Sequence, residues 1–161
     1  MMRDSFGRNI NYLRISLTDR CNLRCKYCMP EEGVHKFSHE EMLSLEEVYE
    51  ITKAFVDLGI NKIRFTGGEP HTRKGIVELI SKVSKLKGVK DIAMTTNGIL
   101  LKEYASDLKA AGLNRVNISL DTLDEEKYKT ITRGGDLFRV LEAIEEAKRV
   151  GLTPIKINSV I

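Results

Sequence analysis

The sequence contains no apolar run long enough to cross a bilayer. Its longest runs cover only a few of the 161 residues, whereas a spanning helix needs about 18. The first residues, Met-Met-Arg-Asp-Ser-Phe-Gly-Arg, also lack the apolar core of a secretory signal. Hydrophobic residues at 42% and charged residues at 30% are typical of a soluble globular protein. We therefore expect no membrane partner and, by default, a cytoplasmic location.

A strong excess of one charge is also missing. The formal net charge is +3, and acidic and basic residues are mixed along the whole chain. Nucleic-acid-binding domains usually carry a larger, clustered positive excess, so we expect no nucleic-acid partner. Such a small total still allows a few lysine and arginine side chains to converge on one small anionic ligand.

Cysteine is scarce, and its placement is the first functional signal. The three cysteines, Cys21, Cys25 and Cys28, form the pattern C-x3-C-x2-C, and none occurs elsewhere. An odd number packed so closely is a poor disulfide framework and favours metal or cluster ligation. Three thiolates on a [4Fe–4S] cluster leave one iron open to a substrate. The alternative is a structural zinc module, which needs a fourth ligand, from His35 or His39.

Glycine opens a repeated phrase, Gly-apolar-x-x-apolar, at Gly59, Gly88, Gly112 and Gly151. Each copy follows a stretch of helical periodicity and precedes a short β-branched run. Glycine at that point accepts the left-handed conformation that ends a helix. The pattern predicts five strands, at residues 13–17, 62–66, 91–95, 115–120 and 154–160.

Regular strand–helix alternation predicts right-handed crossovers and a parallel sheet, and therefore the α/β fold class. The fifth strand would end this sheet on an open edge. We therefore expect residues 1–161 to be a single truncated domain, part of a (β/α) barrel with about five strands present.

Apolar stripes at helical spacing predict the helices between the strands. The stripes comprise Leu45, Val48, Ile51, Phe55 and Leu58; Ile76, Leu79, Ile80, Val83 and Leu86; Leu101, Tyr104, Leu108 and Ala111; and Leu137, Val140, Leu141, Ile144 and Ala147. Ser44 and Glu47 have the spacing of a capping box at the start of the first helix. Thr122 and Glu125 have the same spacing and predict a short additional helix.

The distinctive residues all follow strands. The cysteine segment follows the first strand, Gly67-Gly68-Glu69-Pro70 the second, Thr96-Asn97-Gly98 the third and Asp121-Thr122 the fourth. Loops at the carboxyl ends of parallel strands share one rim, where active sites of α/β proteins gather. Two glycines at a strand end also let the backbone approach a ligand closely.

Together these motifs resemble the radical S-adenosylmethionine superfamily, and more narrowly the molybdenum cofactor biosynthesis protein A family, the GTP 3′,8-cyclases. The segments that carry the resemblance are Leu13-Arg14-Ile15-Ser16-Leu17-Thr18-Asp19-Arg20-Cys21-Asn22-Leu23-Arg24-Cys25-Lys26-Tyr27-Cys28-Met29-Pro30, Ile63-Arg64-Phe65-Thr66-Gly67-Gly68-Glu69-Pro70, Thr95-Thr96-Asn97-Gly98 and Asn117-Ile118-Ser119-Leu120-Asp121. They follow one another through nearly the whole chain.

The resemblance implies that the three cysteines hold a [4Fe–4S] cluster and that S-adenosylmethionine chelates the open iron. An electron would then release a 5′-deoxyadenosyl radical from the bound S-adenosylmethionine. The positions that align with the family's S-adenosylmethionine contacts are Tyr27, Gly68 and Ser119, with Glu69 and Asp121 as further helpers. An electron donor such as flavodoxin or ferredoxin is implied as a partner, and the chain can form an oligomer.

The same resemblance implies GTP as substrate, held by Arg14, Arg64, Thr95 and Lys156. All four are strand residues, and three are cations suited to a triphosphate. In a barrel such side chains point either into a polar interior or outward against helices, where an unpaired charge costs several kcal/mol. Another radical enzyme, such as a peptide-modifying one, is the alternative, and it would lack the set of Arg14, Arg64 and Lys156.

The chain departs from the family in two respects. His71 and Thr72 stand where the family usually has an apolar pair. We expect a surface position for His71, and the alternatives are a coupling to the cluster and an engineered or erroneous residue. The family's second [4Fe–4S] cluster, on C-terminal cysteines, and the C-terminal Gly-Gly tail are absent, as is a sixth strand. We therefore expect the 161 residues to be unable to complete the cyclase reaction alone.

Overall fold

A computed structural model describes residues 2–34, 37–38 and 40–160. Its main sheet is parallel and follows chain order, β3-β4-β5-β6-β7. The strands are β3 (Tyr12–Ser16), β4 (Lys62–Thr66), β5 (Asp91–Thr96), β6 (Arg115–Ser119) and β7 (Lys156–Asn158). The predicted α/β class and five-stranded partial barrel are confirmed. A small antiparallel pair, β1 (Met2–Arg3) with β2 (Asn9–Ile10), was not predicted.

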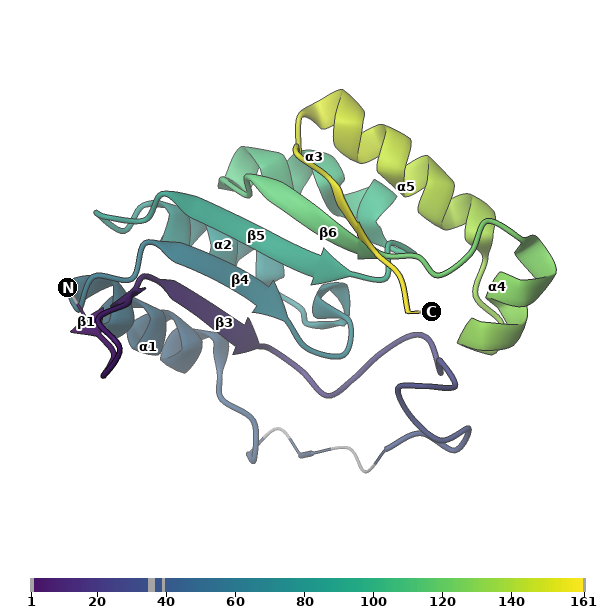
Figure 1. Ribbon diagram of the computed structural model, residues 1–161, viewed down its shortest axis with the longest axis horizontal. Helices are drawn as coiled ribbons and strands as arrows, with labels where there is room; N and C mark the ends of the chain where they lie inside the picture. Colours follow the sequence, from purple (N-terminus) through teal and green to yellow (C-terminus); the bar gives the residue numbers. More distant parts are fainter. Residues whose placement is uncertain (1, 35–36, 39, 161) are drawn as a thin grey trace.

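The helices occupy the predicted crossovers. They are α1 (Leu45–Asp57), α2 (Ile76–Ser84), α3 (Leu101–Ala111), α4 (Glu125–Thr132) and α5 (Leu137–Val150), with a short 3-10 helix, η1 (Pro70–Thr72), after β4. In Figure 1 α1, α2 and α3 lie behind the sheet, and the near face carries no helix among the described residues. No described helix is both long and apolar enough to span a membrane.

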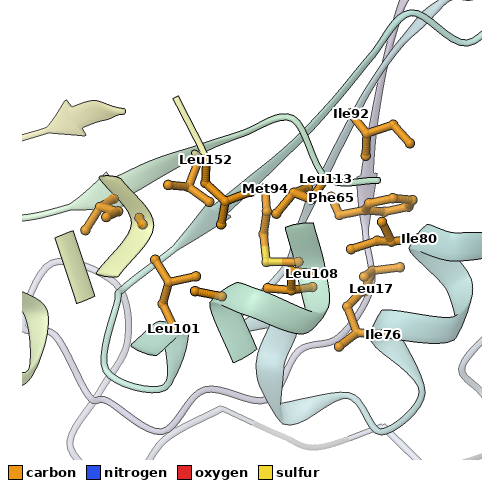
Figure 2. Close-up of a cluster of buried hydrophobic side chains, with 14 of the residues drawn as sticks. Leu17, Phe65, Ile76, Ile80, Ile92, Met94, Leu101, Leu108, Leu113 and Leu152 are labelled. Atoms are coloured by element: carbon orange, nitrogen blue, oxygen red, sulfur yellow. The ribbon is translucent and has the colours of Figure 1, made fainter. Parts of the chain in front are cut away.

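The two faces of the sheet differ in chemistry because side chains alternate along each strand. The face under the helices is apolar, and its fully buried strand residues are Ile63, Phe65, Ile92, Met94, Val116 and Ile118. Figure 2 shows Phe65 and Met94 packed with Ile80 of α2 and Leu108 of α3. This packing leaves most of the polar strand residues on the opposite face, which forms the inner surface of the partial barrel.

The helix starts agree with the sequence at one capping box and differ at the other. Ser44 and Glu47 form the predicted reciprocal box at α1. The N-cap of α4 is Asp124, not Thr122, and its side chain accepts a hydrogen bond from the Lys127 amide. The Thr122 hydroxyl instead accepts from the Asp124 amide. Thr122 therefore closes the turn before the helix, which explains why the predicted box was wrong.

The final strand is shorter than predicted, covering Lys156–Asn158 rather than residues 154–160. It pairs with β6, with Asn117 opposite Lys156 and Ser119 opposite Asn158. The four glycines of the repeated phrase all adopt positive φ, and Gly112 and Gly151 cap α3 and α5 as predicted.

Candidate radical site at the rim

The three cysteines lie on the long loop between β3 and α1, at the carboxyl end of the sheet. Cys21 and Cys25 are partly buried, Cys28 is exposed, and all three are free thiols. The backbone turns between Cys25 and Cys28, because the Cys25 carbonyl accepts from the amides of Cys28 (2.9 Å) and Met29 (3.1 Å). A hollow of about 220 Å³ opens beside Cys21 and is lined also by Asp19, Arg20, Arg24, Met29 and Val34.

The C-terminal end of α4 holds this loop by its backbone. The Lys26 amide donates to the Ile131 carbonyl (2.9 Å), and the Arg24 amide donates to the Thr132 carbonyl (3.2 Å). Arg133 follows with φ of 55° and donates from Nη1 to the carbonyls of Arg24 (2.8 Å) and Met29 (3.0 Å). Nothing in the sequence around Arg133 indicates this clamp, because it depends on contacts across more than 100 residues.

The glycine pair after β4 packs against the start of the cysteine loop. A Cβ on Gly67 would lie 2.6 Å from the Thr18 carbonyl oxygen, and one on Gly68 would lie 2.1 Å from that of Arg20. The Gly68 and Glu69 amides donate to the same two carbonyls, each at 2.7 Å. The close approach predicted here is therefore made by the chain's own backbone on this side, while Gly68 is exposed on the other.

The predicted surface position of His71 is wrong. Its side chain is fully buried and meets the carboxylate of Glu69, which is fully buried as well. The Glu69 carboxylate also accepts from the Thr96 hydroxyl (2.8 Å) and from the Asn97 amide (2.7 Å). Glu69 thus ties the loop after β4 to the loop after β5, and this long-range contact provides the polar partner that a buried histidine needs.

Burial and neighbouring charges affect the protonation of two of the cysteine thiols. Burial raises the pKa of Cys21, and burial followed by the neighbouring Cys28, Cys21 and Asp121 charges raises the pKa of Cys25 to about 11. The bare thiols of Cys21 and Cys25 therefore stay protonated at neutral pH, and a group that binds them must supply positive charge in exchange for their protons. Iron in a cluster meets that requirement.

The donor set fits a cluster. Among the described residues, no three His, Cys, Asp or Glu side chains converge on a site for a single ion, whereas a [4Fe–4S] cluster takes each thiolate on a different iron. The Asn97 side chain also donates to the Cys21 sulfur at 3.7 Å, a contact of the kind that tunes clusters. His35 and His39, the fourth ligands of the zinc alternative, lie outside the described residues.

Tyr27 and Ser119 approach the same rim from different elements. The Tyr27 hydroxyl donates to Asp121 Oδ2 at 2.7 Å, and Asp121 Oδ1 accepts from the Val160 amide at 2.8 Å. Burial and the bond to Asp121 raise the pKa of Tyr27. Ser119 is the last residue of β6 and lies opposite Asn158. The rim therefore brings together the cysteine loop, the glycine loop and the end of β6.

The four residues predicted to hold GTP share the polar face of the sheet. Arg14 lies opposite Arg64, which lies opposite Ala93, while Thr95 and Lys156 flank Asn117 on either side. No ion pair of Arg14 or Arg64 occurs among the described residues. The shared register places Arg14 and Arg64 side by side on the sheet face opposite the buried Ile63 and Phe65.

Neighbouring residues on that face were missed by sequence reasoning. The Arg64 guanidinium stacks over the Tyr12 ring at 5.4 Å, and its Nε is buried with no partner among the described residues. Arg115 forms a two-point ion pair with Asp91 (3.1 and 2.7 Å). Asn117 is buried, and its Oδ1 has no partner among the described residues. The alternation of polar residues along each strand was the signal that would have grouped them.

Replacing Tyr128 of α4 with phenylalanine is expected to reduce the loss of stability at alkaline pH. The ring is 2% exposed, and its hydroxyl has no partner in the described chain. Burial, then the charges of Cys25 and Asp121, raise its pKa. A tyrosine whose folded pKa exceeds the unfolded value stabilises the fold fully below about pH 10 and loses that contribution above it.

Urea unfolding at about pH 9 and pH 11 measures the effect. The variant should lose less unfolding free energy than the parent between the two values. At neutral pH it should gain up to about 1 kcal/mol, because a buried hydroxyl without a partner is removed. Equal losses in the two proteins would contradict the expectation.

Comparison with known proteins supports this description. The family model "Radical SAM superfamily" matches residues 15–161. A GTP 3′,8-cyclase of Peptoclostridium acidaminophilum is 62% identical over 161 residues, covering 100% of this chain and 50% of that protein. One of Alkaliphilus oremlandii is 62% identical over 159 residues, covering 99% and 50%. The chain therefore spans about half the length of the curated relatives it matches.

Solved structures share the fold at low sequence identity. The hydrogenase maturase HydG superimposes with a TM-score of 0.74 at 17% identity, covering 92% of this chain and 34% of that one. SuiB of Streptococcus suis, in its S-adenosylmethionine-bound structure, gives 0.74 at 22% identity, covering 92% and 32%. The match over residues 15–161 and the shared fold show that this chain belongs to the radical SAM superfamily.

Proposed function

We propose that the chain is the cluster-binding half of a GTP 3′,8-cyclase of molybdenum cofactor biosynthesis. Cys21, Cys25 and Cys28 would hold a [4Fe–4S] cluster whose open iron takes S-adenosylmethionine. The observation that carries the proposal is the meeting of the cysteine loop with the glycine loop directly above a polar sheet face bearing Arg14 and Arg64. The relatives of 62% identity are named as cyclases, which supports the same activity.

When bound, the cluster and S-adenosylmethionine supply the one-electron chemistry that produces an organic radical. The residues of this chain would bind S-adenosylmethionine and orient it. The exposed side of Gly68 offers its carbonyl to the amino group of S-adenosylmethionine, and the Ser119 hydroxyl suits a polar edge of the same ligand. Tyr27 is fixed by its bond to Asp121, so its backbone has a defined position for an adenine ring.

The polar face supports a triphosphate. Arg14, Arg64 and Lys156 supply cations, and Thr95 lies among them. The unpartnered Arg64 Nε is a donor in need of an acceptor, because a buried donor without one costs about 1–3 kcal/mol. A phosphate oxygen meets that need.

We assign residues 1–161 to one domain, the radical core of the proposed cyclase. A second cluster and the rest of the barrel belong to the other half of the relatives' length. This chain by itself would bind cofactor without completing the cyclisation. Its reductant would be a small one-electron carrier of the flavodoxin or ferredoxin class.

Anaerobic reconstitution with iron and sulfide tests the proposal. We expect a brown, oxygen-sensitive protein with a reduced-cluster signal in electron paramagnetic resonance and slow release of 5′-deoxyadenosine from S-adenosylmethionine. A colourless, zinc-loaded protein would support the zinc alternative instead. Full conversion of GTP by this chain would contradict the proposed division of labour.

The substrate assignment has its own test. In the full-length parent, the Arg64→Gln variant should weaken GTP binding at least tenfold and leave cluster content unchanged, because one cation contact to phosphate is lost. Absence of GTP binding in the unsubstituted protein would favour the peptide-modifying alternative, whereas equal affinity in the two proteins would remove Arg64 from the GTP site.

A further inference from the structure

A buried acid–histidine pair lies behind the cysteine loop, and its acid is Glu69, which was expected above only as a further helper at the S-adenosylmethionine site. The Glu69 and His71 side chains are both fully buried. Burial of an ionised carboxylate costs several kcal/mol unless hydrogen bonds satisfy it. The surroundings of Glu69 therefore decide whether it keeps its charge.

Four donors converge on the Glu69 carboxylate. Oε1 accepts from the Thr96 hydroxyl (2.8 Å), the His71 amide (3.3 Å) and His71 Nδ1, and Oε2 accepts from the Asn97 amide (2.7 Å). The Thr96 hydroxyl also accepts from the Gly98 amide (3.0 Å) and lies 3.3 Å from His71 Nδ1. An ionised carboxylate accepts on both oxygens. The arrangement therefore suits a negative charge on Glu69.

The geometry also selects the tautomer of His71. Its Nδ1 donates to Glu69, while its Nε2 is buried and has no partner in the described chain. The ring packs against Tyr104 with centroids 5.2 Å apart. A proton on Nε2 would bury a second N–H with nothing to accept it, which costs about 1–3 kcal/mol. This arrangement favours the tautomer in which Nδ1 donates to the Glu69 carboxylate.

Asn97 connects this charge to the cysteine loop. Its backbone amide is bound to Glu69, and its side-chain amide donates to the Cys21 sulfur (3.7 Å) and to Asn22 Oδ1 (2.8 Å). One residue thus separates the carboxylate from a cluster ligand.

We propose that Glu69, held by His71, is a fixed negative charge that lowers the reduction potential of the cluster bound at Cys21. Net charge around a cluster is one of the quantities that set its potential. A nearby negative charge disfavours the added electron and makes the reduced cluster a stronger reductant. Both residues are positioning residues in this role. The inference rests on the proposed function only in that a cluster is bound.

The test is a measurement of the midpoint potential of the anaerobically reconstituted chain. The potential is obtained from a redox titration in which electron paramagnetic resonance monitors the reduced cluster. Glu69→Gln removes the charge at nearly constant volume and should raise the potential. We expect at least a tenfold higher ratio of reduced to oxidised cluster at a fixed potential, which is 59 mV for one electron. Lys74→Gln is the matched control, because this residue lies exposed on the same loop and its charge is screened by solvent.

His71 provides a second pair of variants. His71→Leu removes the donor to Glu69 and should shift the potential in the same direction by a smaller amount. His71→Asn keeps a short N–H donor and should stay near the parent value. If Glu69→Gln fails to take up a cluster, these two variants test whether Glu69 lowers the reduction potential.

The outcomes separate this inference from the proposed function. A parent chain that binds no cluster overturns both. A parent with a cluster, together with Glu69→Gln at or below the parent potential and with equal iron content, overturns the inference alone. The same holds if His71→Leu and His71→Asn both match the parent.

Discussion

Serine at Cys25 is expected to leave the chain folded and to abolish cluster assembly. The Cys25 thiol is only partly buried, so the exchange should change the free energy of unfolding by no more than about 1 kcal/mol. The hydroxyl of serine does not replace a thiolate as an iron ligand under these conditions. Iron and sulfide analysis after anaerobic reconstitution should therefore fall from a full cluster to background.

Lys26→Ser is the matched control for this prediction. Lys26 is exposed on the same loop and donates only its backbone amide, to Ile131, which the substitution preserves. It should take up as much iron as the parent. Equal iron and sulfide in parent and Cys25→Ser would remove Cys25 from the ligand set, and with it the proposed three-thiolate site.

Alanine at Gly68 is expected to damage both the fold and the site. Its Cβ would lie 2.1 Å from the Arg20 carbonyl oxygen and 2.6 Å from the carbonyl carbon, and neither is the end of a flexible side chain. Relief requires the cysteine loop to move away and break the bonds at Thr18 and Arg20. We expect a loss of about 3 kcal/mol in unfolding free energy, measured by urea denaturation, and at least tenfold less cluster.

Gly134→Ala separates the clash from a general effect of alanine. Gly134 also has positive φ (106°), but a Cβ added there would have no atom within 4 Å among the described residues, so only the backbone cost of about 1 kcal/mol applies. If Gly68→Ala were no more harmful than Gly134→Ala, the tight contact between the two loops would not contribute to stability.

Local features of the sequence were sufficient for the order of the elements. Helical stripes, glycine at helix ends and β-branched runs each depend on neighbours a few residues away, and they predicted all five main strands and the crossover helices. The misplaced cap at Thr122 shows the limit of local patterns, since Asp124 offers the same chemistry two residues later.

The sequence alone thus determined the cysteine motif, the motif-bearing loops after the strands and the order of the strands, because ligand spacing and periodicity are local properties. Only the tertiary structure decided what lies behind the rim. The burial of His71 depends on Glu69 and on Thr96, 25 residues further along, and the clamp of Arg133 depends on carbonyls more than 100 residues away. Hydrogen-bond satisfaction of a buried charge is a property of the assembled loops, and no single segment carries it.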